Sequence, residues 1–191
     1  MSDAREWQAT AMLKRPWRVE FFERFATEIA ASPIPVQRIL ELGSGPGFLA
    51  EHLLRKFPHP SYVALDFSAA MHQLAAERLG PLASRVDFVE RSFLDSNWSH
   101  DMGRFEVVVT QQAVHELRHK CHAGDLHCEV RKVLEPGGAY LVCDHFVGEG
   151  GMSNERLYMT VAEQQSALRA AGFASVLLLM LKGGMVLHRA S

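Results

Sequence analysis

The stretch that decides the fold is residues 39–48, which read Ile-Leu-Glu-Leu-Gly-Ser-Gly-Pro-Gly-Phe. A short aliphatic run leads into three glycines at alternate positions, and a helical pattern follows in which Leu49, Leu53 and Phe57 recur every four residues. Glycines between a strand and a helix permit a sharp bend and let the backbone touch a ligand, because no side chain intrudes. The stretch therefore predicts a strand, a ligand-binding turn and a helix.

The same alternation of aliphatic run and helical pattern continues along the chain. The runs are Arg38–Leu42, Tyr62–Leu65, Val86–Val89, Glu106–Thr110 and Ala139–Cys143. Helical patterns occupy most of the gaps, one of them with Ser68 as its N-cap, whereas the polar gap at residues 90–104 is expected to be irregular. Strands that alternate with helices predict parallel pairing with right-handed crossovers, and hence an open α/β sheet.

The pattern changes near the C-terminus. A helix is expected over Val161–Ala171, followed by strands over Ser175–Leu181 and Met185–His188. Only residues 182–184 separate these two strands, which is long enough for a hairpin and too short for a crossover helix. The last two strands should therefore be antiparallel.

The chain is expected to form one domain over residues 1–191, with a helical cap segment at 1–33 and an α/β core at 34–191. An aromatic-rich helical segment, Trp7–Ala31, precedes the first strand. Two roles stay open for this segment, since it could cover one end of the core or act as a flap over a binding site.

Composition excludes several classes of protein. Of the 191 residues, 48% are hydrophobic and 22% charged, which disfavours disorder and coiled coil. The net charge of −2 provides no general attraction for nucleic acid or anionic lipid, so neither is expected as a partner. Three cysteines, Cys121, Cys128 and Cys143, do not suggest a disulfide framework, and Cys128 and Cys143 are expected to pack as small apolar residues. We expect reduced thiols and a cytoplasmic location, with no membrane-spanning or secretory segment.

The spacing of the glycines bears on the ligand. A dinucleotide fingerprint has the form G-x-G-x-x-G, but here Gly47 follows after one residue and the fingerprint's third position holds Phe48. Glu41 would repel a pyrophosphate and suits a cationic group. Asp66 lies 19 residues beyond Gly47, at the end of the second strand, where a carboxylate can accept hydrogen bonds from ribose hydroxyls. The expected ligand has a ribose and a positive charge but no phosphates.

These features resemble the class I S-adenosylmethionine-dependent methyltransferases. Their acidic residue and G-x-G-x-G motif are matched at Glu41, Gly43, Gly45 and Gly47, and their ribose-binding acid at Asp66. The resemblance implies a Rossmann-like, doubly wound, mostly parallel seven-stranded sheet with an antiparallel C-terminal hairpin strand. It also implies S-adenosyl-L-methionine as cofactor and S-adenosyl-L-homocysteine as product, with the motif neighbours Ser44 and Phe67 at the same site.

The resemblance further implies an adenine seat after the third strand. The matching positions are Arg91, Ser92 and Phe93, so the acidic residue common in the family is missing. Ser92 could hydrogen-bond the adenine edge and Phe93 could contact its face. Gln111 would face the methionine portion of the cofactor, although Gln111 and Gln112 could equally belong to a solvated loop.

A histidine cluster supports competing hypotheses. His115–His119 matches H-E-x-x-H, the zinc metalloprotease signature, but the extended ligand spacing is absent and the segment follows a strand of a parallel sheet. Six soft or borderline ligands within 14 positions could also bind zinc or copper: His115, His119, Cys121, His122, His127 and Cys128. Because their spacing fits no standard pattern, we predict no required metal.

The methyltransferase hypothesis gives His115 a different role. It would lie beside the methyl group, where its near-neutral pKa suits a catalytic base for an attacking hydroxyl. The alternative is that His115 caps or packs the adjacent loop. Substrate contacts are expected from Trp7, Trp17 and Phe21 and from the loop Asp144–Met159, with a small molecule as the methyl acceptor.

Two other functions stay open. The chain could bind S-adenosylmethionine without transferring methyl, as a sensor or partner subunit, or it could be a nicotinamide-dependent oxidoreductase. The sequence does not indicate the acceptor, the atom that receives the methyl, or the oligomeric state.

Overall fold

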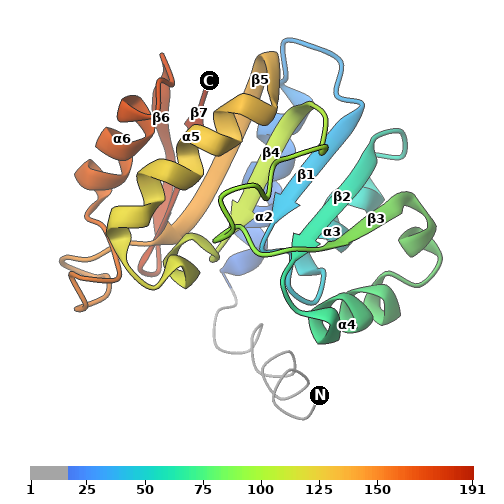
Figure 1. The fold of residues 1–191 in the computed structure, drawn as a ribbon, viewed down its shortest axis with the longest axis horizontal. Helices are drawn as coiled ribbons and strands as arrows, with labels where there is room; N and C mark the ends of the chain where they lie inside the picture. Colours follow the sequence, from blue (N-terminus) through green and yellow to red (C-terminus); the bar gives the residue numbers. More distant parts are fainter. Residues whose placement is uncertain (1–16) are drawn as a thin grey trace.

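The computed structural model describes residues 17–191, which form one seven-stranded sheet in the order β3-β2-β1-β4-β5-β7-β6 (Figure 1). The strands are β1 Arg38–Leu42, β2 Ser61–Asp66, β3 Val86–Glu90, β4 Phe105–Gln111, β5 Leu134–His145, β6 Val176–Lys182 and β7 Met185–Ala190. Strands β1 to β5 pair in parallel, whereas β7 is antiparallel to both β5 and β6. The predicted fold class is confirmed, including the antiparallel hairpin.

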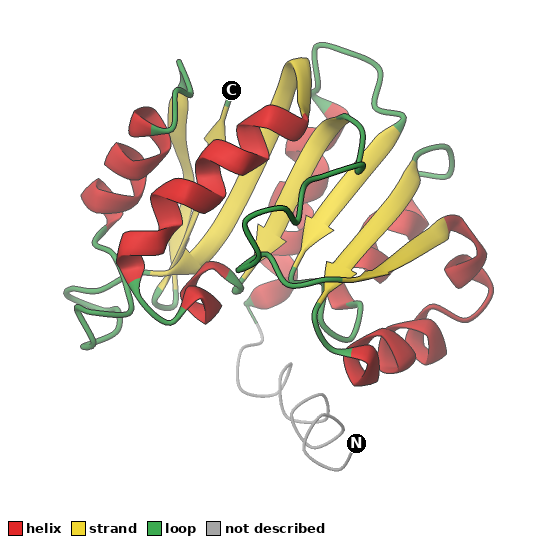
Figure 2. Cartoon of the chain, in the orientation of Figure 1, coloured by secondary structure: helices red, strands yellow, loops and turns green. Residues whose placement is uncertain are grey.

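Helices lie on both faces of the sheet (Figure 2). They are α2 Arg18–Ala30, α3 Phe48–Lys56, α4 Ala69–Leu79, α5 Ala123–Val133 and α6 Val161–Ala170, with short 3₁₀ turns η1 Gly80–Arg85, η2 Val114–Leu117 and η3 Lys120–His122. The capping residue predicted for α4 is confirmed, because the Ser68 hydroxyl accepts a hydrogen bond from the backbone N–H of Met71 at 3.4 Å.

Strand residues divide the core into two layers. Leu40 and Leu42 of β1 pack with α5 and α6 on one face, whereas Ile39 packs with α2 and α3 on the other, as the two-residue period of a strand requires. Helix α2 contributes the fully buried Phe21 and Phe25 to the second layer. The described part of the N-terminal segment thus covers the core, while Trp7 lies outside the described residues.

Two expectations about the loops and thiols have different outcomes. The polar gap before β4 is irregular, as predicted, and it carries the buried Trp98. Cys143 is buried, but Cys128 is exposed, so the expected packing of Cys128 is wrong. The reason is helical geometry, since Cys128 lies one position after the buried His127 of α5 and is therefore rotated toward solvent.

Within residues 17–191, no helix combines the length and the apolar character needed to cross a bilayer.

Candidate functional site

A cavity of about 350 Å³ lies at the carboxyl ends of β1, β2 and β4. In an open α/β sheet, ligands bind at this edge, where neighbouring strands send their crossovers to opposite faces. Many of the residues expected to bind the cofactor line it, namely Glu41, Gly43, Ser44, Gly45, Asp66, Phe67, Phe93 and Gln111. Arg18 and Phe22 of helix α2 also line the cavity.

The glycine turn has two kinds of position. Gly43, Gly45 and Gly47 all have positive φ, at +67°, +52° and +76°. A Cβ atom at Gly43 would lie 2.3 Å from the Cβ of Ala113, and one at Gly47 would lie 3.0 Å from the Cβ of Ala75. At Gly45 no heavy atom lies within 4 Å of that position. Gly43 and Gly47 therefore serve close packing, whereas Gly45 keeps the backbone accessible to a ligand.

Asp66 joins the glycine turn to the start of α4. Its Oδ2 accepts a hydrogen bond from the backbone N–H of Gly45 at 2.8 Å, and its Oδ1 accepts one from that of Ser68 at 2.9 Å. The side chain is buried. Because each carboxylate oxygen has two acceptor sites, both oxygens retain capacity for a further donor such as a ribose hydroxyl.

Glu41 is the second carboxyl group of the cavity and only 2% exposed. Burial raises the pKa of Glu41 to about 8, although the hydroxyl of Tyr62 donates a hydrogen bond to Oε2 at 2.8 Å and favours the charged form. The nearby charge of Asp66 raises the pKa further. Glu41 is therefore largely protonated at neutral pH, and a cation in the cavity would favour its ionisation.

Other polar atoms of the cavity lack protein partners. Within residues 17–191, the amide nitrogen and oxygen of Gln111 and the hydroxyl of Ser44 are buried and have no hydrogen-bond partner. Leaving such groups unpaired costs about 1–3 kcal/mol each, so native proteins usually pair them. A polar ligand in the cavity would satisfy them, and the amino-acid portion of S-adenosylmethionine fits that requirement.

Of the two residues expected to contact the adenine, one lines the cavity and the other does not. Phe93 lines the cavity, as does Phe67, whose side chain is 64% exposed. Ser92 is not part of the lining, and its hydroxyl accepts a hydrogen bond from the backbone N–H of Leu94 at 3.1 Å. Substrate contacts were also expected from Trp17 and Phe21, but neither lines the cavity. Phe21 is fully buried in the core, and Trp17 packs against Gly183.

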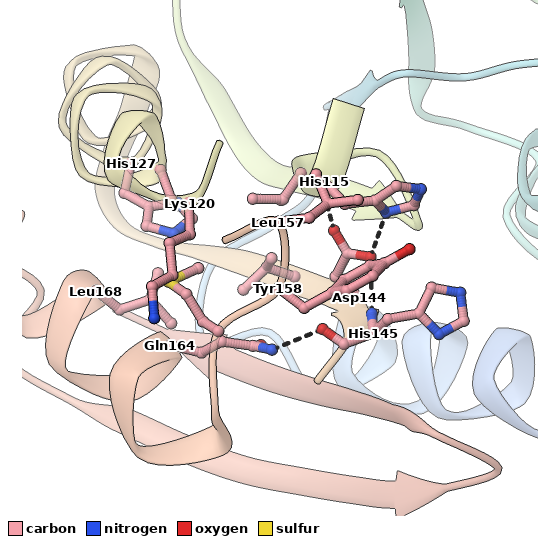
Figure 3. A pocket seen from close by; sticks show the side chains of 13 residues that line it. His115, Lys120, His127, Asp144, His145, Leu157, Tyr158, Gln164 and Leu168 are labelled. Atoms are coloured by element: carbon pink, nitrogen blue, oxygen red, sulfur yellow. Dashed lines mark hydrogen bonds and ion pairs between the residues drawn. The ribbon is translucent and has the colours of Figure 1, made fainter. Parts of the chain in front are cut away.

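His115 lies in the 3₁₀ turn η2, next in sequence to Glu116, which lines this cavity, and it lines a second pocket (Figure 3). Its Nδ1 is 2.7 Å from Oδ1 of Asp144, and its backbone N–H donates to Oδ2 of the same carboxylate at 2.8 Å. Together with His145, Tyr158 and mostly apolar residues, these side chains line this second pocket of about 20 Å³. This pocket has room for a water molecule and not for a methyl acceptor.

A chain of hydrogen bonds runs from α2 to the end of β5. Arg18 Nε donates to Oε1 of Gln112 at 2.8 Å, and Nε2 of Gln112 lies 2.8 Å from Nε2 of His145. The other ring nitrogen of His145 lies 3.1 Å from the carbonyl oxygen of Gly184. The rings of His115, His145 and Tyr158 contact one another, with centroid separations of 5.6 to 5.8 Å.

The H-E-x-x-H segment does not form the helix that the metalloprotease signature requires. Arg118 has φ +65° and separates the turns η2 and η3, so His115 and His119 are not one helical turn apart. In the part of the chain from Trp17 onward, no group of three or more potential ligands is placed to hold a metal ion.

Sequence reasoning placed Asp144 and His145 in the expected substrate loop, whereas both belong to strand β5, and it missed Arg18 and left Gln112 undecided. One signal was present for Asp144, because it directly follows the buried end of a parallel strand, where functional polar residues gather. No comparable signal marked Arg18, which reaches the site from 94 positions away.

Comparison with known proteins identifies the family. The methyltransferase domain family matches residues 39–138, just over half of the chain. A malonyl-[acyl-carrier protein] O-methyltransferase of Geobacter sulfurreducens is 26% identical over 171 residues, covering 81% of this chain and 62% of the relative. A demethylmenaquinone methyltransferase of Clavibacter sepedonicus is 31% identical over 121 residues, covering 63% and 46%. The chain thus spans less than two thirds of the length of these relatives.

A solved structure shares the fold. An S-adenosylmethionine-dependent methyltransferase from Clostridium acetobutylicum superposes with a TM-score of 0.79 at 9% identity, covering 100% of this chain and 98% of the other. The family match and this shared architecture agree with the glycine motif and with the position of Asp66 at the end of β2. The chain belongs to the class I S-adenosylmethionine-dependent methyltransferase family.

Proposed function

We propose that this chain transfers a methyl group from S-adenosylmethionine to a small-molecule acceptor. The observation that carries the proposal is the cavity at the ends of β1 and β2, where open backbone at Gly45 lies beside two buried carboxyl groups and the unpaired amide of Gln111. A sulfonium nucleoside has a ribose for Asp66, a positive charge for Glu41 and an amino-acid portion for Gln111. No dinucleotide matches all three.

Each candidate residue has an assigned part in this proposal. Asp66 accepts hydrogen bonds from the ribose hydroxyls, and Gly45 lies against the nucleoside. Glu41 and Gln111 face the charged amino-acid portion. The remaining candidates shape the turn or surround the adenine, namely Gly43, Ser44, Gly47, Phe67 and Phe93, whereas Ser92 lies outside the cavity lining and receives no part.

The reaction requires little of the protein beyond positioning the two reactants and excluding water. When bound, S-adenosylmethionine supplies a methyl group on a positively charged sulfur, which is already an excellent leaving group. The chain must hold the acceptor in line with that methyl and keep water away. Apolar side chains such as Phe22 and Phe48 line the cavity and serve the second task.

Several features support a small acceptor. The net charge of −2 provides no general attraction for nucleic acid. The two relatives described above are named for different acceptors, a carrier-bound malonyl group and demethylmenaquinone, so they favour no single compound. Cys121, Cys128 and Cys143 are free thiols, which supports the cytoplasmic setting proposed from the sequence.

Thermal unfolding with four ligands tests the cofactor class. S-adenosylmethionine and S-adenosylhomocysteine should each raise the melting temperature, because a ligand that binds only the folded state stabilises it, and NAD and zinc should not. Stabilisation by NAD alone would favour the oxidoreductase. Binding of S-adenosylmethionine without methyl transfer to any of a wide panel of acceptors would favour the non-catalytic binding protein.

Asp66→Asn tests the ribose assignment. The variant loses a charged acceptor, so the affinity for S-adenosylmethionine should fall by about 1–3 kcal/mol, roughly 10- to 100-fold, in titration calorimetry. Asp87→Asn, at an exposed position of β3, is the matched control and should bind as the wild type does. An unchanged affinity in Asp66→Asn would remove the ribose role.

A further inference from the structure

Three polar side chains are buried together beneath helices α5 and α6. They are His127 of α5, Tyr140 of β5 and His188 of β7, which are at most 2% exposed. The ring centroids of His127 and Tyr140 are 5.6 Å apart. His188 lies opposite Val142 on the neighbouring strand, and Val142 and Tyr140 belong to the core layer that packs against α5 and α6. We call His127, Tyr140 and His188 the buried histidine cluster.

The buried histidine cluster lacks the hydrogen bonds that buried polar groups normally make. Within residues 17–191, Nδ1 of His127, both ring nitrogens of His188 and the hydroxyl of Tyr140 are enclosed without a hydrogen-bond partner. Native proteins pair most such groups, because burial removes their hydrogen bonds to water. Apolar side chains at the two histidine positions would avoid this loss. The imidazoles therefore weaken the packing of α5 and α6 on the sheet.

The surroundings of the cluster disfavour a protonated imidazole. Burial, with a smaller effect from His188, lowers the pKa of His127 to about 4. Burial, with a smaller effect from Arg169 of α6, also lowers the pKa of His188 to about 4. Burial raises the pKa of the phenol in the cluster, which stays neutral. Lys120 and Asp144 line the second pocket together with His127, so this pocket adds one charge of each sign.

A histidine that becomes exposed can take up a proton that the buried ring cannot. In water the pKa of histidine is about 6.5, so an exposed ring is mostly protonated at pH 5, whereas a buried ring with a pKa of about 4 is mostly neutral. The open form then binds more protons. The stability of the closed form is therefore fully present above about pH 6.5 and is lost as the pH falls toward 4. Between pH 7 and pH 5, the ratio of closed to open forms should fall about 20-fold for each histidine that is exposed.

We propose that the buried histidine cluster is an acid-sensitive switch, which keeps α5 and α6 packed on the sheet at neutral pH and releases them in mild acid. Release of these two helices is sufficient, because they cover the face of the sheet on which His188 and Tyr140 lie. Local openings of this kind require less free energy than global unfolding. This inference does not depend on the proposed function.

The release should affect one part of the site and not the other. His127 lines the second pocket together with Asp144 and His145, so movement of α5 opens the wall of that pocket. The described lining of the cofactor cavity contains no residue of α5 or α6. Acid should therefore disturb the region at the ends of β4 and β5 before it disturbs the glycine turn.

Hydrogen–deuterium exchange measured by mass spectrometry tests where the fold opens. The whole chain is compared at pH 7, 6 and 5, with each rate corrected for the intrinsic pH dependence of exchange. Peptides from α5 and α6 should lose protection about 20-fold or more between pH 7 and pH 5, whereas peptides from β1 and α3 should keep it. Equal loss of protection in all elements, or no loss in any, would overturn the switch.

Apolar substitutions remove the titration and keep the packing. His127→Leu and His188→Leu, alone and together, should suppress the loss of protection at pH 5 and should be at least as stable as the wild type at pH 7. His100→Leu, at a side chain that is 75% exposed, is the matched control and should respond to acid as the wild type does. If melting temperature shows that a leucine variant does not fold, His127→Gln and His188→Gln, which also take up no proton, replace it.

Nitrogen-15 NMR of the imidazole rings gives a readout that a merely structural role would not change. In the folded wild type, the rings of His127 and His188 should remain neutral at pH 5.5. Rings that are protonated at this pH in a fully protected protein would contradict the proposal, as would leucine variants that open in acid like the wild type.

A second buried histidine provides a competing explanation. Burial also lowers the pKa of His72, on α4 at the other end of the sheet. If acid exposes α4 and leaves α5 and α6 protected, or if His72→Leu suppresses the response and the double leucine variant does not, the response belongs to His72 and the switch assigned to His127 and His188 is wrong.

Discussion

Two regions along the same edge of the sheet are built in different ways. At the ends of β1 and β2, the glycine turn depends on backbone conformation and close packing, since Gly43 has φ +67° and lies tightly against Ala113. At the ends of β4 and β5, the dyad region, which comprises Gln112, His115, Asp144 and His145, is held by side-chain hydrogen bonds, which join Arg18 to Gln112 across 94 positions and His115 to Asp144 across 29. A change at the glycine turn should therefore act through strain and packing, whereas one in the dyad region should act through lost hydrogen bonds between elements.

The two regions also treat a buried carboxyl group differently. Glu41 accepts a hydrogen bond from the hydroxyl of Tyr62, and burial raises its pKa to about 8. Asp144, equally buried, accepts from three N–H groups, two of which belong to the backbone. The two regions thus differ in the number of donors that the fold supplies to a buried carboxyl group, one for Glu41 and three for Asp144.

Gly43→Ala should have the largest effect on stability and would test how tightly the glycine turn is packed. The new methyl group meets the Cβ of Ala113 at 2.3 Å, and φ of +67° is strained for alanine, so the free energy of unfolding should fall by about 3 kcal/mol in urea titration. Gly45→Ala, with open space around it, should lose only about 1 kcal/mol and weaken S-adenosylmethionine binding instead. Equal losses of stability would contradict the distinction between the two glycines.

Gln112→Leu should have the next largest effect and breaks the link between α2 and the dyad region. It removes an acceptor from the buried Arg18 and a donor from His145, which should lower the free energy of unfolding by about 2 kcal/mol. Urea titration measures the loss, with Gln73→Leu at an exposed position of α4 as the control. If both variants are equally stable, the chain of hydrogen bonds contributes nothing to the fold.

The smallest expected effect concerns Glu41 and is a pH dependence of the affinity for S-adenosylmethionine. Because the pKa of Glu41 is about 8 in the free protein, a bound cation must drive ionisation, and binding of S-adenosylmethionine should release a proton at pH 7. Affinity should rise about fivefold between pH 7 and pH 8 as this cost disappears. Titration calorimetry at both pH values measures the rise.

Glu41→Gln itself should show no such rise, and a wild-type affinity that is flat over this range would remove the charge role of Glu41. The stability of the free protein depends on pH in the opposite direction and falls as the pH rises. A carboxyl group whose pKa is raised from 4.5 contributes stability that is fully present below pH 4.5 and is lost as the pH rises through about 8.

Local patterns predicted much of the fold and part of the site. Three residues between the last two strands indicated the hairpin, which is confirmed, and the glycine spacing with Glu41 and Asp66 predicted a ligand site where the structure has a cavity. The prediction for Cys128 was wrong because composition does not reveal which side of a helix a residue occupies. The contact of His115 with Asp144 was not predictable, because Asp144 belongs to a strand that follows 29 positions later.

What the sequence determined by itself is the order of strands and helices and the bend at Gly43–Gly47, because periodicity and backbone freedom act over a few residues. What only the tertiary structure decided is the pairing of His115 with Asp144. The parallel register that sets Gln111 opposite Cys143 brings the residues following β4 level with Asp144 at the end of β5. Such a register depends on hydrogen bonds and packing across the whole sheet, and no short stretch of the chain contains that information.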